Sequence, residues 1–311
     1  MSARSLPYSQ SCLNSLLRNC AEPLTLRIIT DSQKDMEQLV STFAKPAGNC
    51  GHTLEVFDKE AVDVRAQARF LGYPALLEFR NGHPCWRKVT DPELFTEPGD
   101  EVITIDPDVF FPNRFIFEQT AATGLFLMWQ PPNCLLPERL VQDVFDSDIA
   151  VADHTDIGVC QYRAPLPLDF LEQLLSDIPT APHASSMHVE SIIWAALAMH
   201  MGGGYLDPRA WHCFQNSIIG RLERKMGRKP IDLLRRIDFS TIKAFHAGGA
   251  AKDWLPDAER VGVLDRASPH QVTLPPSPTK PFEPYSSGKF SRKLKTRALA
   301  RRVGLYSLLA N

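Results

Sequence analysis

Hydrophobic and polar positions follow two alternating periods in the first third of the chain. Leu13, Leu16 and Leu17 have the spacing of an apolar helix stripe, with Ser9 as the expected cap, and residues 24–29 form an apolar strand that ends at Thr30 and Asp31. The same periods predict a helix at 32–43, a strand at 53–57 and a helix at 61–79 interrupted at 72–74. This alternation favours an α/β fold with an open, mostly parallel, doubly wound sheet flanked by helices.

A short apolar strand at 102–105 ends in Asp106, Pro107 and Asp108. Ligands of α/β sheets collect at the carboxyl ends of strands, where two aspartates separated by one residue can share Mg²⁺ or Mn²⁺. Pro107 fixes the backbone between them. Taken alone, the motif is equally typical of a solvated turn after a strand.

A second motif lies far downstream and begins at His246. Gly248 and Gly249 allow close approach of the backbone to phosphate, Lys252 supplies a cation, and Trp254 supplies an aromatic anchor. The alternative interpretation is a satisfied loop histidine beside a surface lysine. Two aspartates, an imidazole and a lysine together suit a divalent ion that carries a diphosphate. The two motifs therefore indicate an enzyme that acts on a nucleotide diphosphate.

These two motifs resemble those of the metal-dependent glycosyltransferases of the GT-A fold. The likeness is greatest to the retaining family-eight group, which carries Asp-x-Asp and a late His-x-x-Gly-x-x-Lys-Pro-Trp. The resemblance implies that Lys252 holds the donor diphosphate, together with the glycines before it, although Asp253 replaces the family's proline and weakens the local positive field. It also implies a site for Mn²⁺ or Mg²⁺ made of Asp106, Asp108 and His246.

Two weaker elements follow the family's order between these motifs. Residues 155–159 resemble its Phe-Asn-Ser/Ala-Gly-Val segment, with Asp156 where asparagine is usual, and a helical pattern follows at 168–175. Glu190 and the helix after it resemble an Asp-Gln-helix element, matched only in the acid. Asp156 and Glu190 are therefore candidate catalytic carboxylates or acceptor contacts, and the resemblance spans roughly residues 8 to 254.

Aromatic side chains in the middle of the chain are candidates for sugar contacts. Tyr205 and Trp211 are possible platforms for the flat face of a sugar ring, whereas core packing is expected for Trp194. The four histidines between 183 and 212 lack the fixed pair of a metal motif, so structural or acceptor-facing roles are expected for them.

The donor side of the expected site departs most from the family. In the family, the first strand ends at the nucleotide base. Residues 1–6 of this chain are too short and polar for a strand, so we expect that the first strand is lost or lies upstream. Asp31 is the candidate nucleotide contact at the end of the next strand. Arg69 is the candidate for the donor sugar or diphosphate, Arg65 is expected on a solvated helix face, and Lys88 is expected to be a structural surface residue.

Composition agrees with one soluble catalytic domain, expected at residues 1–266. The chain has 311 residues, of which 44% are hydrophobic and 23% charged, enough for one substantial α/β core. Its seven cysteines are scattered without a Cys-x-x-Cys pair, so neither a zinc site nor a disulfide framework is indicated and a reduced cytoplasmic setting is expected. No signal peptide and no membrane span are expected.

The C-terminal region changes in composition. Residues 267–288 are rich in proline and predict a linker, and residues 289–311 carry seven Lys or Arg residues without an acid, interspersed with leucines. This tail is compatible with an amphipathic helix on an anionic membrane surface, or with a disordered segment. Nucleic-acid binding is not expected, because the rest of the chain is acidic and lacks a recognition motif.

The sequence therefore predicts a glycosyltransferase that moves a sugar from a UDP-sugar or related donor to a carbohydrate or lipid-linked acceptor, as in polysaccharide biosynthesis. Retention of stereochemistry at the transferred sugar is implied by the resemblance alone. A sugar-nucleotide pyrophosphorylase or hydrolase is an alternative, although such enzymes favour an N-terminal glycine-rich loop. The other alternative is a non-catalytic relative that binds sugar or membrane.

Overall fold

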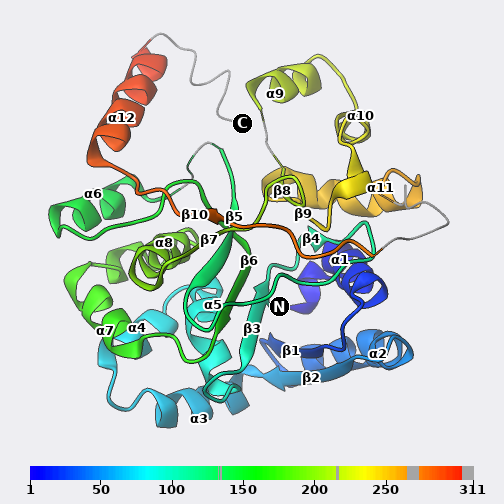
Figure 1. Cartoon of the computed structure of the whole chain (residues 1–311), viewed down its shortest axis with the longest axis horizontal. Coiled ribbons are helices and arrows are strands. Elements are labelled where there is room, and N and C mark those ends of the chain that lie inside the picture. The colour runs from blue at the N-terminus through cyan, green and yellow to red at the C-terminus, as the bar shows by residue number, and fades with distance from the viewer. Residues whose placement is uncertain (132, 134, 215–216, 265–272, 303–311) are drawn as a thin grey trace.

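The computed structural model describes residues 1–131, 133, 135–214, 217–264 and 273–302. Figure 1 shows strands at the centre of the molecule and helices on both sides of them. The predicted α/β class is thus confirmed. In the part of the chain that is described, no helix has both the length and the apolar character needed to cross a membrane.

The N-terminal elements follow the predicted alternation closely. They are α1 (Leu6–Asn19), β1 (Thr25–Thr30), α2 (Gln33–Asn49), β2 (Thr53–Asp58), α3 (Lys59–Arg69), α4 (Pro74–Arg80) and α5 (Arg87–Thr90). Pro74 begins α4 because proline fits the first turn of a helix, where an N–H has no helical partner, and this explains the interruption. Ser9 lies inside α1 and is not its cap, whereas the Ser32 hydroxyl caps α2 by accepting from the Asp35 N–H at 3.2 Å.

The remaining elements are shorter and more irregular. They are β3 (Glu101–Ile105), β4 (Val109–Phe110), β5 (Leu125–Trp129), α6 (Glu138–Asp146), β6 (Thr155–Arg163), α7 (Leu168–Asp177), α8 (Val189–Met201), β7 (Gly203–Tyr205), β8 (Trp211–Cys213), α9 (Ile218–Lys225), α10 (Pro230–Leu234), β9 (Ala244–His246), α11 (Leu255–Arg260), β10 (Lys280–Pro281) and α12 (Ser287–Arg302). The predicted strand before Asp106 and the predicted helices after Asp156 and Glu190 are confirmed as β3, α7 and α8.

The described strands form three sheets. β1 and β2 pair with each other, a five-stranded sheet has the order β10-β7-β5-β6-β3, and a third sheet has the order β4-β9-β8. Pairing is parallel in β1–β2, β5–β7 and β8–β9, and antiparallel in the other pairs. In the five-stranded sheet only β5 and β7 pair in parallel, since β6 runs against both β5 and β3 and β10 runs against β7, so this sheet is mixed where a mostly parallel one was expected.

The largest hydrophobic core lies between the five-stranded sheet and its helices. α8 is buried over most of its length, and Trp194 within it is fully buried, which confirms its expected core position. Tyr205 and Trp211 are buried as well, so they are not exposed platforms for a sugar. The indole N–H of Trp211 instead donates to Glu118 Oε1 at 2.7 Å.

The described part of the proline-rich segment is packed against the domain. β10 pairs with β7, and single bridges join Phe115 to Leu274 and Ala152 to Pro284. A proline-rich linker is expected to resist strand formation, yet residues 280–281 form β10 and Leu274 and Pro284 each form a bridge. Proline cannot donate a hydrogen bond, but its neighbours can, and the carbonyls of the segment still accept: the Asp153 N–H donates to the Glu283 carbonyl at 2.7 Å.

Candidate functional site

Backbone pairing brings the two predicted motifs together. β4 pairs antiparallel with β9, so that Val109 lies opposite His246. The Ala247 N–H donates to the Asp108 carbonyl at 3.0 Å, and Asp106 begins the turn that joins β3 to β4. The aspartates and the histidine are distant in the sequence, yet neighbouring strands carry them to one place.

The two ring nitrogens of His246 face different carboxylates. Nδ1 lies 2.8 and 3.0 Å from the two oxygens of Asp156. Nε2 lies 3.4 Å from Asp108 Oδ1 and 3.9 Å from Asp106 Oδ2. Ligand atoms of Asp106, Asp108 and His246 all lie within 4.8 Å of one another, a separation that a single ion can bridge. The ring therefore has one nitrogen held and the other directed at the acids of the predicted metal site.

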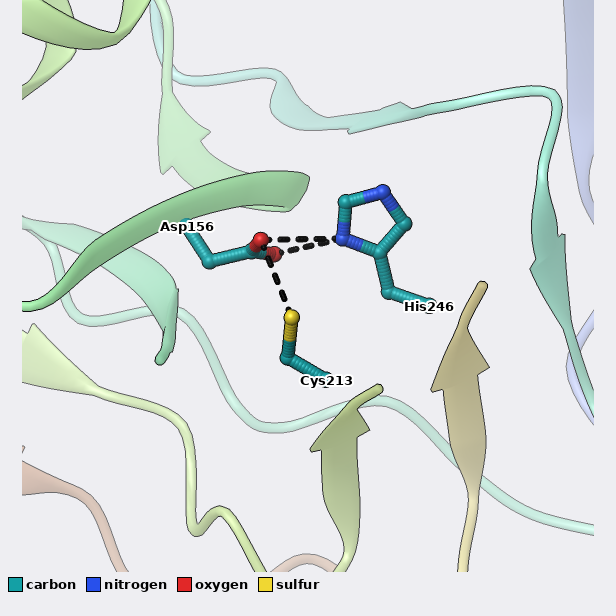
Figure 2. Close-up of side chains that lie close together, drawn as sticks. All are labelled: Asp156, Cys213 and His246. Atoms are coloured by element: carbon teal, nitrogen blue, oxygen red, sulfur yellow. Dashed lines mark hydrogen bonds and ion pairs between the residues drawn. The ribbon is translucent and has the colours of Figure 1, made fainter. Parts of the chain in front are cut away.

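Asp156 is the residue that holds the ring. Figure 2 shows it between Cys213 and His246, with its carboxylate turned toward both side chains. The Gly158 N–H donates to its Oδ1 at 3.0 Å and the Cys213 thiol to its Oδ2 at 3.3 Å. Asp156 is only 4% exposed, so its carboxylate oxygens bond to groups in the protein interior and do not face a sugar acceptor.

Gly158 makes room for the imidazole. A Cβ at this position would lie 2.5 Å from His246 Nδ1, which is closer than any real Cβ contact. Only glycine therefore allows the ring to pack against β6 while it bonds to Asp156. This gives a physical reason for a glycine two residues after Asp156, a spacing that sequence resemblance noted without a cause.

Charge in the site is balanced by mutual attraction of buried groups. Burial opposes protonation of His246, but the Asp156 carboxylate and hydrogen bonds to Asp108 and Asp156 outweigh it and raise the pKa of His246 well above its ordinary value. Burial likewise opposes ionisation of the acids. At Asp108 and Asp156 the histidine prevails and the pKa of each is lowered, whereas at Asp106 burial prevails and the pKa is raised.

Lys88 is part of the site, contrary to the prediction of a structural surface residue. Its ammonium on α5 contacts the Asp106 carboxylate directly and lies 3.1 Å from Glu190 Oε1 on α8. The side chain is 23% exposed and Glu190 is nearly buried. Burial raises the pKa of Glu190 to about 8, with Lys88 acting in the opposite direction. No sequence pattern indicates this role, because α5 is a single turn without periodicity.

Glu190 has one carboxylate oxygen to spare. Its Oε2 is buried and, among the described residues, has no hydrogen-bond partner. A buried acceptor without a partner is costly, so it marks a position where a ligand group or water is expected. The ammonium of Lys88 contacts both carboxylates and so links the candidate Glu190 to Asp106.

The second motif continues from His246 into a tight turn. Gly248 precedes the 3₁₀ turn Gly249–Trp254, and Gly249 has a φ of +66°, a conformation that favours glycine. The Lys252 ammonium lies 5.2 Å from the centre of the Tyr8 ring, over its face. Burial and then the charge of Asp108 raise the pKa of Tyr8.

The two remaining predicted donor contacts lie further out. Arg69 is exposed at the end of α3, and its charge acts on Tyr73 and on Glu93. Glu93 bonds to Tyr162, which pairs with the first half of β3, away from Asp106. Asp31 is exposed after β1, on the side where its charge reaches the amino group of Met1.

Arg65 is exposed, as expected for a solvated helix face, but its contacts are with aromatic rings. Its guanidinium lies 5.1 Å from the centre of the Phe57 ring and 4.7 Å from that of Phe95, although the side chain remains exposed. Cation–π packing of this kind fastens α3 to β2 and not to the acids. The basic residue that the structure brings to Asp106 is therefore Lys88.

Comparison with known proteins gives few matches. No family model matches the chain, and no curated protein matches its sequence. Among solved structures, the apo crystal structure of mouse xyloside xylosyltransferase 1 is similar with a TM-score of 0.49 and 10% identity, over 80% of this chain and 94% of that one. At this level of likeness, the chemistry of the site follows from its own side chains.

Proposed function

We propose that this chain is a metal-dependent glycosyltransferase of the GT-A type. It would move a sugar from a nucleotide diphosphate donor, a UDP-sugar in the family that its motifs resemble, to a carbohydrate or lipid-linked acceptor. The observation that carries the proposal is the convergence of two distant motifs, with His246 Nε2 directed at Asp108 and Asp106. The proposal includes retention of stereochemistry at the transferred sugar, and its support is the resemblance of these motifs to those of a retaining family.

The three side chains fit a divalent ion. Two carboxylates and one imidazole nitrogen match the preference of Mn²⁺ or Mg²⁺ for hard oxygen ligands with at most a few nitrogen ligands. Their mutual distances allow one ion to contact Asp106, Asp108 and His246, and Asp156 fixes the ring from behind. When bound, such an ion neutralises charge on the leaving diphosphate.

The chain's own cations complete the charge balance. Lys252, on the turn after His246, would donate to a diphosphate oxygen, and its contribution grows as the glycosidic bond breaks and charge accumulates there. Gly248 and Gly249 let the backbone approach the same phosphates. When the donor is absent, Lys88 bridges Asp106 and Glu190. When the donor binds, Lys88 would exchange one of these two carboxylates for a donor oxygen.

Glu190 and Asp156 take different parts in this scheme. Because no described residue bonds to Oε2 of Glu190, this oxygen is available to a hydroxyl of the donor sugar, and we assign Glu190 to the reacting end of the site. Asp156 is enclosed by His246, Cys213 and Gly158, and we assign it as a positioning residue. Carboxylates that hold the second nitrogen of a ligating histidine fix its tautomer and raise its basicity.

The test is donor binding with and without the metal. Mn²⁺ with UDP should raise the melting temperature of the wild-type protein, because a ligand that binds the folded state stabilises it by mass action. Asp106→Ala and Asp108→Ala should each abolish this shift and the Mn²⁺-dependent release of UDP from donor sugars. Asp58→Ala removes only the side-chain cap of α3, at the end of β2, and serves as the matched control. Unchanged donor binding in both site variants would contradict the proposal.

The cellular setting remains part of the proposal. We expect the chain to work in the reducing cytoplasm and to contact the inner face of a membrane through residues 289–311. Residues 303–311 lie outside the described residues. They include Val303, Leu305 and Leu308, which contribute apolar positions to the predicted amphipathic tail. The described part of this tail forms α12, and Phe290 at its start is buried against the domain.

A further inference from the structure

α9 carries an apolar stripe that the domain does not cover. Ile219, Leu222 and Met226 are 70%, 55% and 71% exposed and follow one another at the spacing of a single helix face, with Met226 directly after the helix end. None of the described side chains of α9 is buried. Ser217 caps the helix by accepting from the Gly220 N–H at 3.0 Å, so the helix is formed locally without a core.

Cations surround this stripe. Seven Lys or Arg residues and two acids occupy positions 217–236. Lys225, Arg228 and Lys229 are exposed beside Met226. One of the two acids, Glu223, is already bonded to Arg236 at 2.8 and 3.0 Å, which leaves the surface positive. A short helix with exposed aliphatic side chains and surrounding cations is the pattern of a helix that lies in a membrane interface.

α12 presents a second basic surface at the same edge of the molecule. In Figure 1 both α9 and α12 lie along the upper edge, far from α3. One face of α12 is bound to the domain, since Lys289 contacts Asp153 at 3.1 Å and Lys293 donates to the Asn133 carbonyl at 2.7 Å. Its exposed face carries Arg292, Lys295, Leu299 and Arg302.

We propose that α9 is an interfacial helix that inserts Ile219, Leu222 and Met226 into an anionic bilayer, with the exposed face of α12 on the same surface. A protein partner is disfavoured, because stable protein interfaces bury roughly 800 Å² on each side and this stripe consists of three side chains. Anionic headgroups match the charge of both helices, and aliphatic side chains among cations match the acyl boundary.

The position of α9 connects this surface to the candidate site. The Arg224 guanidinium lies 5.1 Å from the centre of the Trp254 ring, two residues after Lys252. A membrane under α9 would therefore bring lipid-linked molecules to the turn that carries Lys252. This connection rests on the proposed function and narrows its acceptor to a lipid-linked one, whereas membrane contact by α9 does not depend on that function.

Vesicle binding by the full chain tests the inference. The probes are vesicles of phosphatidylcholine with and without phosphatidylglycerol, and the variant combines Ile219→Ser, Leu222→Ser and Met226→Ser. The matched control combines Val64→Ser and Leu71→Ser, which remove side chains that are 73% and 85% exposed near α3, at the other edge of the molecule. We expect the triple variant to partition roughly 100-fold more weakly to anionic vesicles, from the apolar area withdrawn from the bilayer, and the control to match wild type.

Three results would overturn the inference. The first is equal partitioning of the triple variant and wild type. The second is equal loss in the control, which would show a general effect of surface polarity. The third is a wild-type dimer in light scattering that the triple variant converts to monomer without any change in vesicle binding, which would make the stripe a contact between copies. UDP release in solution is measured separately, so a failure of the proposed function is recognised independently.

Discussion

Replacing Asp156 by asparagine tests whether this buried carboxylate prepares His246 for a metal. The substitution keeps the shape of the side chain but removes a charge that His246 Nδ1 contacts at 2.8 and 3.0 Å. An asparagine amide can also donate to Nδ1, and this would place the imidazole proton on Nε2, the nitrogen that faces Asp108.

The expected loss follows from the hydrogen bond that changes. A bond to a charged acceptor is worth about 1.5–3 kcal/mol and a neutral one about 1 kcal/mol, so the difference is roughly 0.5–2 kcal/mol. Since about 1.4 kcal/mol corresponds to a tenfold change, the dissociation constant for Mn²⁺ should rise by about 10- to 100-fold when the tautomer effect is included.

Titration calorimetry with Mn²⁺ measures this change. The measurement is made at several pH values, because Asp156 raises the pKa of His246 and protons compete with the metal for the ring. Asp153→Asn is the matched control, because Asp153 is another buried acid that bonds to Asn133 and Lys289 outside the site. A dissociation constant within about threefold of wild type in Asp156→Asn, alongside lost binding in Asp108→Ala, would refute the assignment of Asp156 as the residue that prepares the ligand.

Three further predictions concern turnover, pH and packing. Lys252→Ala should lower kcat by about 100-fold while donor affinity changes little, since the lysine is worth most when charge grows on the diphosphate; steady-state kinetics that show a loss of affinity alone would make it a uniform binder. Because burial raises the pKa of Glu190 from 4.5 to about 8, the folded chain gains stability that is full below pH 4.5 and is lost as pH rises through 8. In metal-free urea unfolding, Glu190→Gln should remove this dependence, on the order of 5 kcal/mol, and equal pH slopes in both proteins would contradict it. Phe290→Ala should cost about 3 kcal/mol of unfolding free energy because the ring is buried against Phe145, whereas Leu299→Ala on the same helix, 62% exposed, should cost little; equal losses would mean that α12 is not docked.

Local pattern was sufficient for the elements that carry strong periodicity. The helices α1, α2, α3 and α7 and the strands β1, β2 and β3 follow from the apolar pattern, whereas α8 was predicted from the family resemblance. Residues 72–74 marked the break between α3 and α4. Residue type and motif order predicted that Asp106, Asp108 and His246 lie together. The pairing of β4 with β9 is what brings them into contact. Strands of two or three residues, such as β4, β8 and β9, carry too little periodicity to be found in the sequence.

Tertiary structure alone decided which charges complete the site. Lys88 lies on a one-turn helix whose pattern is that of a surface, and only the packing of α5 beside α8 and β3 brings its ammonium to Asp106 and Glu190. Asp156 was a candidate only through the likeness of residues 155–159 to a family segment. Its contacts with Cys213 on β8 and His246 on β9 depend on strands that are distant in the sequence. Long-range pairing of this kind is fixed by the packing of the whole core, because short strands gain stability only when distant segments close around them.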